Sequence, residues 1–242
     1  MSTIHRDVGH FVCDPDGGVP VLHLDEPADL VRAIGKLHYL CALENRAVYF
    51  CGQAGLYGGR LVPSLLREAN RILAFEEAVA RRQNLEGYLS GFWDNDYRRK
   101  YVADGPCVEA LLQHYGLKTT WLDVVDTVWP ALWFSSHEIC REEEGSISRF
   151  LSRPSAQEFC YVLCLSTGKN PKLGLGYTAD EDCEVVDLRK AVNSVFVRPH
   201  CLHGCLMRAV DGRTNYWNLV QDVIRLRTDK VLCWLGASAL TS

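Results

Sequence analysis

The sequence of 242 residues lacks any apolar run that approaches the roughly 18 residues needed to cross a bilayer. Its residues 1–18, MSTIHRDVGHFVCDPDGG, place His, Arg and Asp where a secretory leader needs an apolar segment. These two absences predict a cytoplasmic protein that has no membrane partner.

A surplus of positive charge is also absent, because the formal net charge is −4. This excludes a protein that holds nucleic acid mainly by releasing counterions from the phosphates. A local basic patch stays open as a hypothesis: Arg81 and Arg82, together with residues 97–101 (YRRKY), interleave cations with aromatic rings. A solvated helix end explains the same residues equally well.

The Cys-x2-Cys spacing typical of zinc sites is not found, although the chain has eleven cysteines. An odd count in a chain of this size argues against a disulfide framework, and most cysteines lie in apolar runs. Cys160 and Cys164, with Cys201, His203 and Cys205, would offer soft ligands if both segments were strands. Reduced, buried thiols explain the pattern better, so we expect no metal.

Repeats, low-complexity tracts and long linkers are missing as well, which favours one domain. Hydrophobic spacing predicts an α+β or α/β fold, with helices inserted between the strands of a mixed or antiparallel sheet. We expect helices over residues 26–43, 63–92, 104–117 and 126–140. Strands or extended segments are expected over residues 46–53, 119–125, 158–166, 183–188, 194–210 and 230–237.

Four short segments carry the most specific pattern: VYFCGQ, LVPSLLRE, LLQHYGLKTTWLD and FVRPHCLHGCL. Together they resemble the FRG domain family. Its motifs read aromatic-Arg-Gly-Gln, Pro-Ser-Leu, Gln-His-Tyr-Gly-Leu-Pro-Thr-Arg-Leu-Leu-Asp, and a late Arg that precedes a Gln and a Gly. The resemblance runs over residues 46–210. It predicts an N-terminal extension with a helix over residues 1–45 and one continuous FRG-like domain over residues 46–242.

This resemblance implies a fold like that of the ADP-ribosyltransferases, which use NAD as co-substrate. In that class the motif Arg at a strand end contacts the NAD phosphate or ribose. The matching positions here are Gln53, His114 and Tyr115 as catalytic candidates, and Cys51, Gly52, Lys118, Thr119, Asp123 and Arg198 as NAD-binding candidates. The implied acceptor is a macromolecule, nucleic acid or protein, in a bacterial defence or toxin setting.

Several motif positions depart from the family pattern. Cys51 and Thr120 replace Arg, Lys118 replaces Pro, and Leu202 stands where Gln is expected. A thiol cannot imitate the paired hydrogen bonds that a guanidinium makes to phosphate. Lys118 and Arg198 retain some positive charge. The alternative to an enzyme is therefore an inactive FRG-like module that senses a ligand or binds another protein.

Several of the candidate site residues have both a functional and a structural interpretation. Gly52 and Gln53 either orient a ligand at a strand end or form a tight turn. His114 and Tyr115 either line a pocket beside Asp123 or complete a helix end and the core.

Two further assignments stay open. Cys51, His114 and Asp123 have the residue types of a nucleophilic triad, without any indication that they meet. A carboxylate for the NAD ribose is unassigned, with Glu138 and Glu184 considered.

Overall fold

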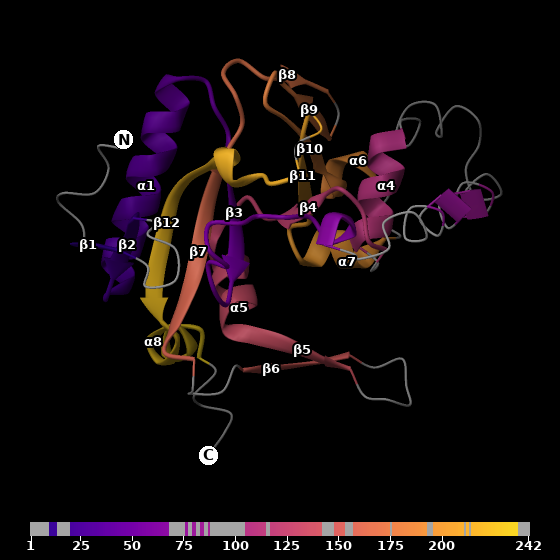
Figure 1. Ribbon diagram of the computed structural model, residues 1–242. Coiled ribbons are helices and arrows are strands. Elements are labelled where there is room, and N and C mark those ends of the chain that lie inside the picture. Colours follow the sequence, from indigo (N-terminus) through magenta and orange to yellow (C-terminus); the bar gives the residue numbers. More distant parts are fainter. Residues whose placement is uncertain are drawn as a thin grey trace. The chain divides into compact units, whose positions relative to one another are not determined.

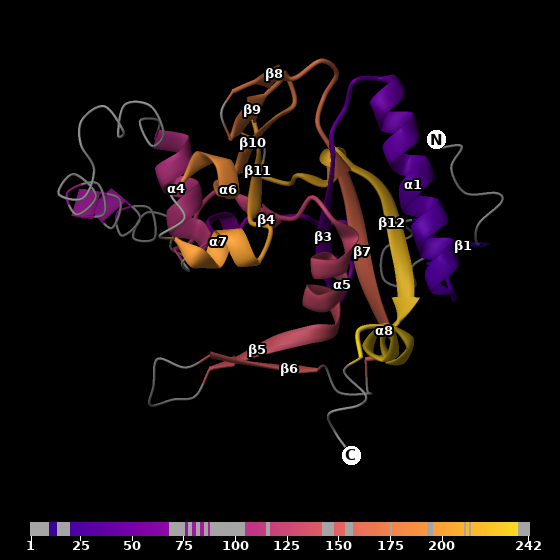
Figure 2. The ribbon, with the colours of Figure 1, turned by 180° about the vertical axis from the view of Figure 1, so that it is seen from behind.

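The structure is a computed structural model, and Figures 1 and 2 show it from opposite sides. It describes residues 10–13, 20–67, 76, 79–80, 83–84, 87, 105–114, 117–141, 148–152, 157–174, 176–192, 196–210, 212 and 214–236. The fold is α+β, and its sheets are mixed and antiparallel, as predicted. No helix in these ranges combines the length and the apolar character that a membrane crossing requires.

The chain forms two compact units and passes between them four times. Unit 1 comprises Met1–Arg60, Thr127–Ser166 and Val220–Ser242, and unit 2 comprises Leu61–Asp126 and Thr167–Leu219. The predicted boundary between residues 45 and 46 stays a prediction.

Ten elements of unit 1 lie in the described residues. These are β1 (His10–Cys13), β2 (Pro20–Leu24), α1 (Pro27–Leu43), β3 (Val48–Gln53), α5 (Val128–Ser136), β5 (His137–Arg141), β6 (Ser148–Ser152), β7 (Phe159–Ser166), β12 (Val220–Arg227) and α8 (Thr228–Trp234). The helices α1, α5 and α8 pack against strands of the main sheet, while β5 and β6 pair with each other in a separate hairpin (Figure 1).

The main sheet of unit 1 has the order β1-β2-β12-β7-β3. β12 runs parallel to β2, and the other neighbouring strands described in this sheet are antiparallel. β7 is the most deeply buried of these strands: all its side chains from Cys160 to Leu165 are at most 8% exposed. This explains why its sequence, FCYVLCLS, shows no polar alternation.

α1 begins at Pro27, which needs no backbone hydrogen-bond donor in the first helical turn. It buries Leu30, Ala33, Leu37 and Cys41, whose spacing of three and four residues puts them on one helical face. The prediction for residues 26–43 is confirmed.

α5 ends at Ser136, so the helical prediction for residues 137–140 is wrong. The hydroxyl groups of Ser135 and Ser136 both donate to the carbonyl of Leu132, at 2.8 Å. His137 then adopts an extended backbone (ψ 154°) and opens β5. Serine hydroxyls that bond back to the preceding turn offer an alternative to further helical hydrogen bonding.

The described residues of unit 2 also include ten elements with assigned bounds. These are the 3-10 helices η1 (Leu65–Arg67) and η2 (Trp217–Leu219), the helices α4 (Gly105–His114), α6 (Leu188–Ala191) and α7 (Val197–Cys201), and the strands β4 (Leu122–Val124), β8 (Lys172–Leu173), β9 (Tyr177–Ala179), β10 (Cys183–Asp187) and β11 (Cys205–Ala209). Its sheet has the order β4-β11-β10-β9-β8, and every neighbouring pair is antiparallel.

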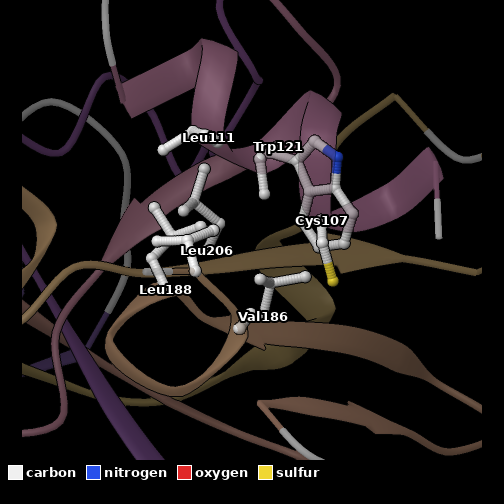
Figure 3. Close-up of a cluster of buried hydrophobic side chains, with 9 residues drawn as sticks. Cys107, Leu111, Trp121, Val186, Leu188 and Leu206 are labelled. Carbon is white, nitrogen blue, oxygen red and sulfur yellow. The ribbon is translucent and has the colours of Figure 1, made fainter. Parts of the chain in front are cut away.

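The core of unit 2 forms where α4 covers this sheet. Cys107 and Leu111 of α4 gather with Val186 of β10 and Leu206 of β11, and Trp121 closes the cluster (Figure 3). Trp121 is fully buried. The core therefore holds Trp121 of the QHYGLKTTWLD motif directly before β4.

Two predicted extended segments contain helices instead. Residues 194–210 include α7 before β11, and residues 230–237 belong largely to α8. Short apolar runs do not distinguish a buried strand from a buried helix, because neither shows a clear polar face. The helix predicted over residues 63–92 lies mostly outside the described residues.

Candidate functional site

The candidate residues fall on both units. Cys51, Gly52 and Gln53 lie on β3 in unit 1. In unit 2, His114 ends α4, Lys118 and Thr119 lie in the following loop, Asp123 is in β4 and Arg198 is in α7. Tyr115 and the basic segments around Arg81 and residues 97–101 lie outside the described residues.

Gly52 is where α5 comes closest to β3. A Cβ atom at this position would lie 1.9 Å from the carbonyl oxygen of Ala131 and 2.9 Å from the backbone nitrogen of Ser135. Gly52 pairs with Val162 of β7, so it belongs to the strand rather than to a turn. The glycine is needed for space, and neither interpretation from the sequence describes this role.

Cys51 and Gln53 flank Gly52 and project to the opposite face of β3, because side chains alternate along a strand. Cys51 pairs with Leu163 and is half-buried. The Oε1 atom of Gln53 is buried and accepts no hydrogen bond from the described residues. The Cys at the position of the family Arg thus sits inside a paired strand.

The loop around Pro63 is tied to the central motif. The backbone N–H of Leu65 donates to the carbonyl of Thr119 at 3.1 Å. The hydroxyl of Ser64 lies 3.5 Å from the Oε1 atom of Gln113. Two segments that are about 50 residues apart in the family pattern therefore meet in unit 2.

Gln113 connects the loop after α4 to β4. Its Oε1 atom accepts from the backbone N–H of Thr119 at 3.1 Å and from the Thr119 hydroxyl at 2.9 Å. Its Nε2 atom donates to the Oδ2 atom of Asp123 at 3.1 Å. Sequence reasoning did not select Gln113, although it is the first residue of QHYGLKTTWLD.

His114 and Asp123 are brought together, as the sequence suggested. The Nδ1 atom of His114 lies 3.8 Å from the Oδ1 atom of Asp123. The His114 side chain is 9% exposed and the Asp123 side chain is 60% exposed. A carboxylate next to an imidazole can orient the ring, so this pair has the residue types of a general base and its positioning partner.

Gly204 supports the other side of the His114 ring. A Cβ atom at this position would lie 3.0 Å from the Cε1 atom of His114 and 3.2 Å from the Cα atom of Pro199. The turn that carries Gly204 is closed by its backbone N–H, which donates to the Pro199 carbonyl at 2.9 Å. The late motif, FVRPHCLHGCL, therefore contacts the central motif at His114.

An ion-pair network also contacts this turn at His203. The Nδ1 atom of His203 lies 3.2 Å from Asp126 and 2.9 Å from Arg189. Arg189 also donates to Asp187 from Nε at 2.9 Å. Burial favours the neutral acid, but hydrogen bonds from Arg189 and Lys190 outweigh it, so the pKa of Asp187 is lowered.

Two positive side chains lie near these motifs. Lys118 follows α4 and is exposed, and Arg198 is exposed on α7 beside Pro199. Phosphate binding needs cations that can reach solvent, and both residues meet that condition. Thr119, by contrast, is 1% exposed.

Thr120, at the second position where the family has Arg, faces a structural ion pair. Its hydroxyl lies 3.5 Å from Glu109, and Arg208 donates to the same carboxylate at 3.1 Å. Arg208 also donates to Glu184 at 2.5 Å and stacks over the Trp121 ring at 4.4 Å. Glu109 thus takes its cation from Arg208, and Thr120 lies beside this ion pair.

The two carboxylates considered for the ribose differ in placement. Glu184 is in β10, where it accepts from Arg208 and from the hydroxyl of Tyr177 at 2.5 Å. Burial, followed by the hydrogen bond to Glu184, raises the pKa of Tyr177. Glu138 is in β5 of unit 1. Glu184 is committed to this cluster, so neither residue gains a catalytic assignment.

Most of the cysteines in the described residues are buried, as the apolar runs around them predicted. Burial raises the pKa of Cys164 and raises that of Cys205 to about 12. Cys201 lies in α7 and His203 in the following turn, so they do not share a strand face with Cys205. Across the described ranges, no three His, Cys, Asp or Glu side chains are placed to hold a metal ion.

The fold and this arrangement define an α+β domain whose specific motif is built around Gln113, His114 and Asp123. Residues 46–144 match the family model of the FRG domain. The resemblance to the FRG domain family seen in the sequence is therefore confirmed over these residues. The match ends before the segment that carries Arg198 and Gly204. No curated protein and no solved structure matches the chain.

Proposed function

We propose that this protein is an ADP-ribosyltransferase-like enzyme that uses NAD to modify a macromolecule. The observation that carries the proposal is the His114–Asp123 pair, held between Gln113 and Gly204 within the most specific motif of the FRG match. A nearly buried imidazole with a carboxylate partner suits proton transfer at a reacting group.

In this reaction the bond between nicotinamide and C1′ of the ribose breaks, and C1′ bonds to an oxygen or nitrogen of the acceptor. The acceptor loses a proton as this bond forms. His114 takes up that proton, and Asp123 stabilises the resulting imidazolium. Nicotinamide leaves as a neutral molecule, so no acid is required for it.

Lys118 and Arg198 are the residues that we assign to the pyrophosphate of NAD. Both are exposed cations on segments that adjoin His114, through the loop after α4 and through the turn at Gly204. They take the place of the family Arg that is missing at Cys51. The acceptor is nucleic acid or protein, and the biological setting is bacterial defence or a toxin.

A second function is favoured by the substitutions themselves. The thiol of Cys51 cannot bind phosphate as a guanidinium does, and Thr120 lies beside the Glu109–Arg208 ion pair. A chain with these changes suits a module that binds a nucleotide or a protein without turnover.

The test uses purified protein and NAD labelled in its adenylate phosphate, alone and with DNA, RNA or a protein extract. Nicotinamide release and label transfer are both followed, and NAD binding is measured separately by calorimetry. We expect Lys118→Ala and Arg198→Ala to weaken NAD binding. Lys172→Ala, an equally exposed lysine on β8, is the matched control and should bind NAD as the native protein does.

Each result separates the two functions. Release and transfer that disappear in His114→Gln support the enzyme and identify the class of acceptor. Binding without release that Cys51→Arg leaves unchanged supports the sensing module, whereas binding that Cys51→Arg strengthens supports an altered enzyme pocket. Neither binding nor release at millimolar NAD rules out both uses of this nucleotide.

A further inference from the structure

We infer that Gln113 is a positioning residue that holds the Asp123 carboxylate toward His114, and that Thr119 sets the orientation of the Gln113 side chain. This inference rests on the proposed function, because it assigns His114 a part in proton transfer. It adds Gln113 to the site and gives Thr119, which the sequence suggested as an NAD-binding residue, a positioning role without substrate contact.

The orientation of the Gln113 amide follows from its partners. A backbone N–H can only donate, so the Gln113 atom that faces the N–H of Thr119 at 3.1 Å must be the oxygen. The NH2 group then necessarily faces Asp123, at 3.1 Å. The structure leaves no alternative assignment of oxygen and nitrogen for this side chain.

Thr119 uses its polar groups within unit 2. Its hydroxyl lies 2.9 Å from the Gln113 oxygen and accepts the backbone N–H of Trp121 at 3.0 Å. Its carbonyl accepts from Leu65 at 3.1 Å. Since Thr119 is also 1% exposed, its contribution to the site is to orient Gln113 rather than to touch NAD.

Asp123 requires such a support because its side chain is 60% exposed. An exposed carboxylate beside a histidine is ordinarily mobile, and such a pair by itself holds neither side chain firmly in place. The hydrogen bond from Gln113 restricts one carboxylate oxygen and leaves the other 3.8 Å from the Nδ1 atom of His114. That separation closes to a hydrogen bond with a small adjustment when substrate binds.

The variant Gln113→Glu separates positioning from packing. A glutamate keeps an acceptor for both donors of Thr119, so the tie between α4 and the loop is retained. It replaces the NH2 donor with a second carboxylate that faces Asp123 and repels it. Gln113→Ala removes both contacts and serves as the comparison for loss of stability.

The first readout is the pair of ring ¹⁵N chemical shifts of His114 in the native protein, in Gln113→Glu and in Asp123→Asn. They report which ring nitrogen carries the proton, and they require no catalytic activity. We expect Gln113→Glu to change the His114 shifts in the same direction as Asp123→Asn does. His114 shifts that remain native in Gln113→Glu would overturn the inference.

The second readout is the rate of nicotinamide release. We expect Gln113→Glu to lower turnover by about tenfold or more, with the KM for NAD unchanged, because the loss affects proton transfer and not binding. The double variant Gln113→Glu/Asp123→Asn restores an amide–carboxylate hydrogen bond with its polarity reversed. It should regain native stability without regaining turnover, whereas recovery of both would show a purely structural role.

These two readouts also separate this inference from the proposed function. If the native protein releases no nicotinamide but the His114 shifts respond as described, the positioning by Gln113 stands and the enzymatic proposal fails. If nicotinamide is released and Gln113→Glu leaves both turnover and the His114 shifts native, the proposed function stands and the positioning fails.

Discussion

Replacing Gly52 with alanine should destabilise the protein more than any other single-methyl addition to β3. The new Cβ would lie 1.9 Å from the Ala131 carbonyl oxygen, and ordinary contact begins near 3.4 Å. The helix α5 would therefore have to move by about 1.5 Å, or β3 would have to bend, because the obstructing atoms belong to helix backbone. Overpacking of this kind costs about 3 kcal/mol.

Thermal unfolding followed by circular dichroism measures this effect. For a chain of this size, about 3 kcal/mol corresponds to a decrease in Tm of roughly 6–12 °C. Gly55→Ala is the matched control, since the nearest atoms to its new Cβ lie at 3.9 Å. We expect its Tm to stay within about 2 °C of the native value. A Gly52→Ala variant that unfolds at the native temperature would refute the close approach of α5 to β3.

Three further changes test unit 2. Because the pKa of Asp187 is lowered in the folded protein, its ionised carboxylate stabilises the fold above the unfolded pKa, and this stabilisation is lost as pH falls through the folded pKa. Asp187→Asn lacks this group, so its stability should fall less than that of the native protein below about pH 4, as measured by denaturant titration. Arg208→Ala leaves both Glu109 and Glu184 without their shared cation, so the free energy of unfolding in urea should fall by about 2 kcal/mol. Arg208→Lys should recover only part of this free energy, because an ammonium group cannot make the same paired hydrogen bonds. Tyr216→Phe removes the 2.8 Å hydrogen bond to the Thr120 carbonyl and should lose about 1 kcal/mol, seen as a Tm decrease of roughly 2–4 °C.

Local hydrophobic patterns in the sequence identified the helices with one buried face and the strands that are buried on both faces. The spacing of Leu30, Ile34 and Leu37 predicted α1, and the continuous apolar run of residues 158–166 predicted β7. The end of α5 was not predictable in this way. The residues after Ser136 continue an apolar spacing, and the break depends on hydroxyl groups that can bond either to water or to the preceding turn.

For the candidate site, the sequence left open whether His114 lies beside Asp123, and the structure places the two side chains 3.8 Å apart. The role of Gln113 was missed, since an amide shows its function only through the partners on either side of it. The role of Gly52 was also missed. Its constraint comes from Ala131, about 80 positions later, and pairwise spacing along a sequence does not report such a contact.

β12 lies in the interior of the unit 1 sheet, between β2 and β7, although it is the last strand in the sequence. On the ribosome, β2 and β7 cannot pair with β12 until residues 220–227 have emerged, so both strands keep open edges that other nascent chains can join. The segment that matches the FRG family contains β3 and α5 but neither β7 nor β12. Residues 46–144 produced alone should therefore aggregate rather than fold, and the family match marks a motif region that is smaller than the unit that folds.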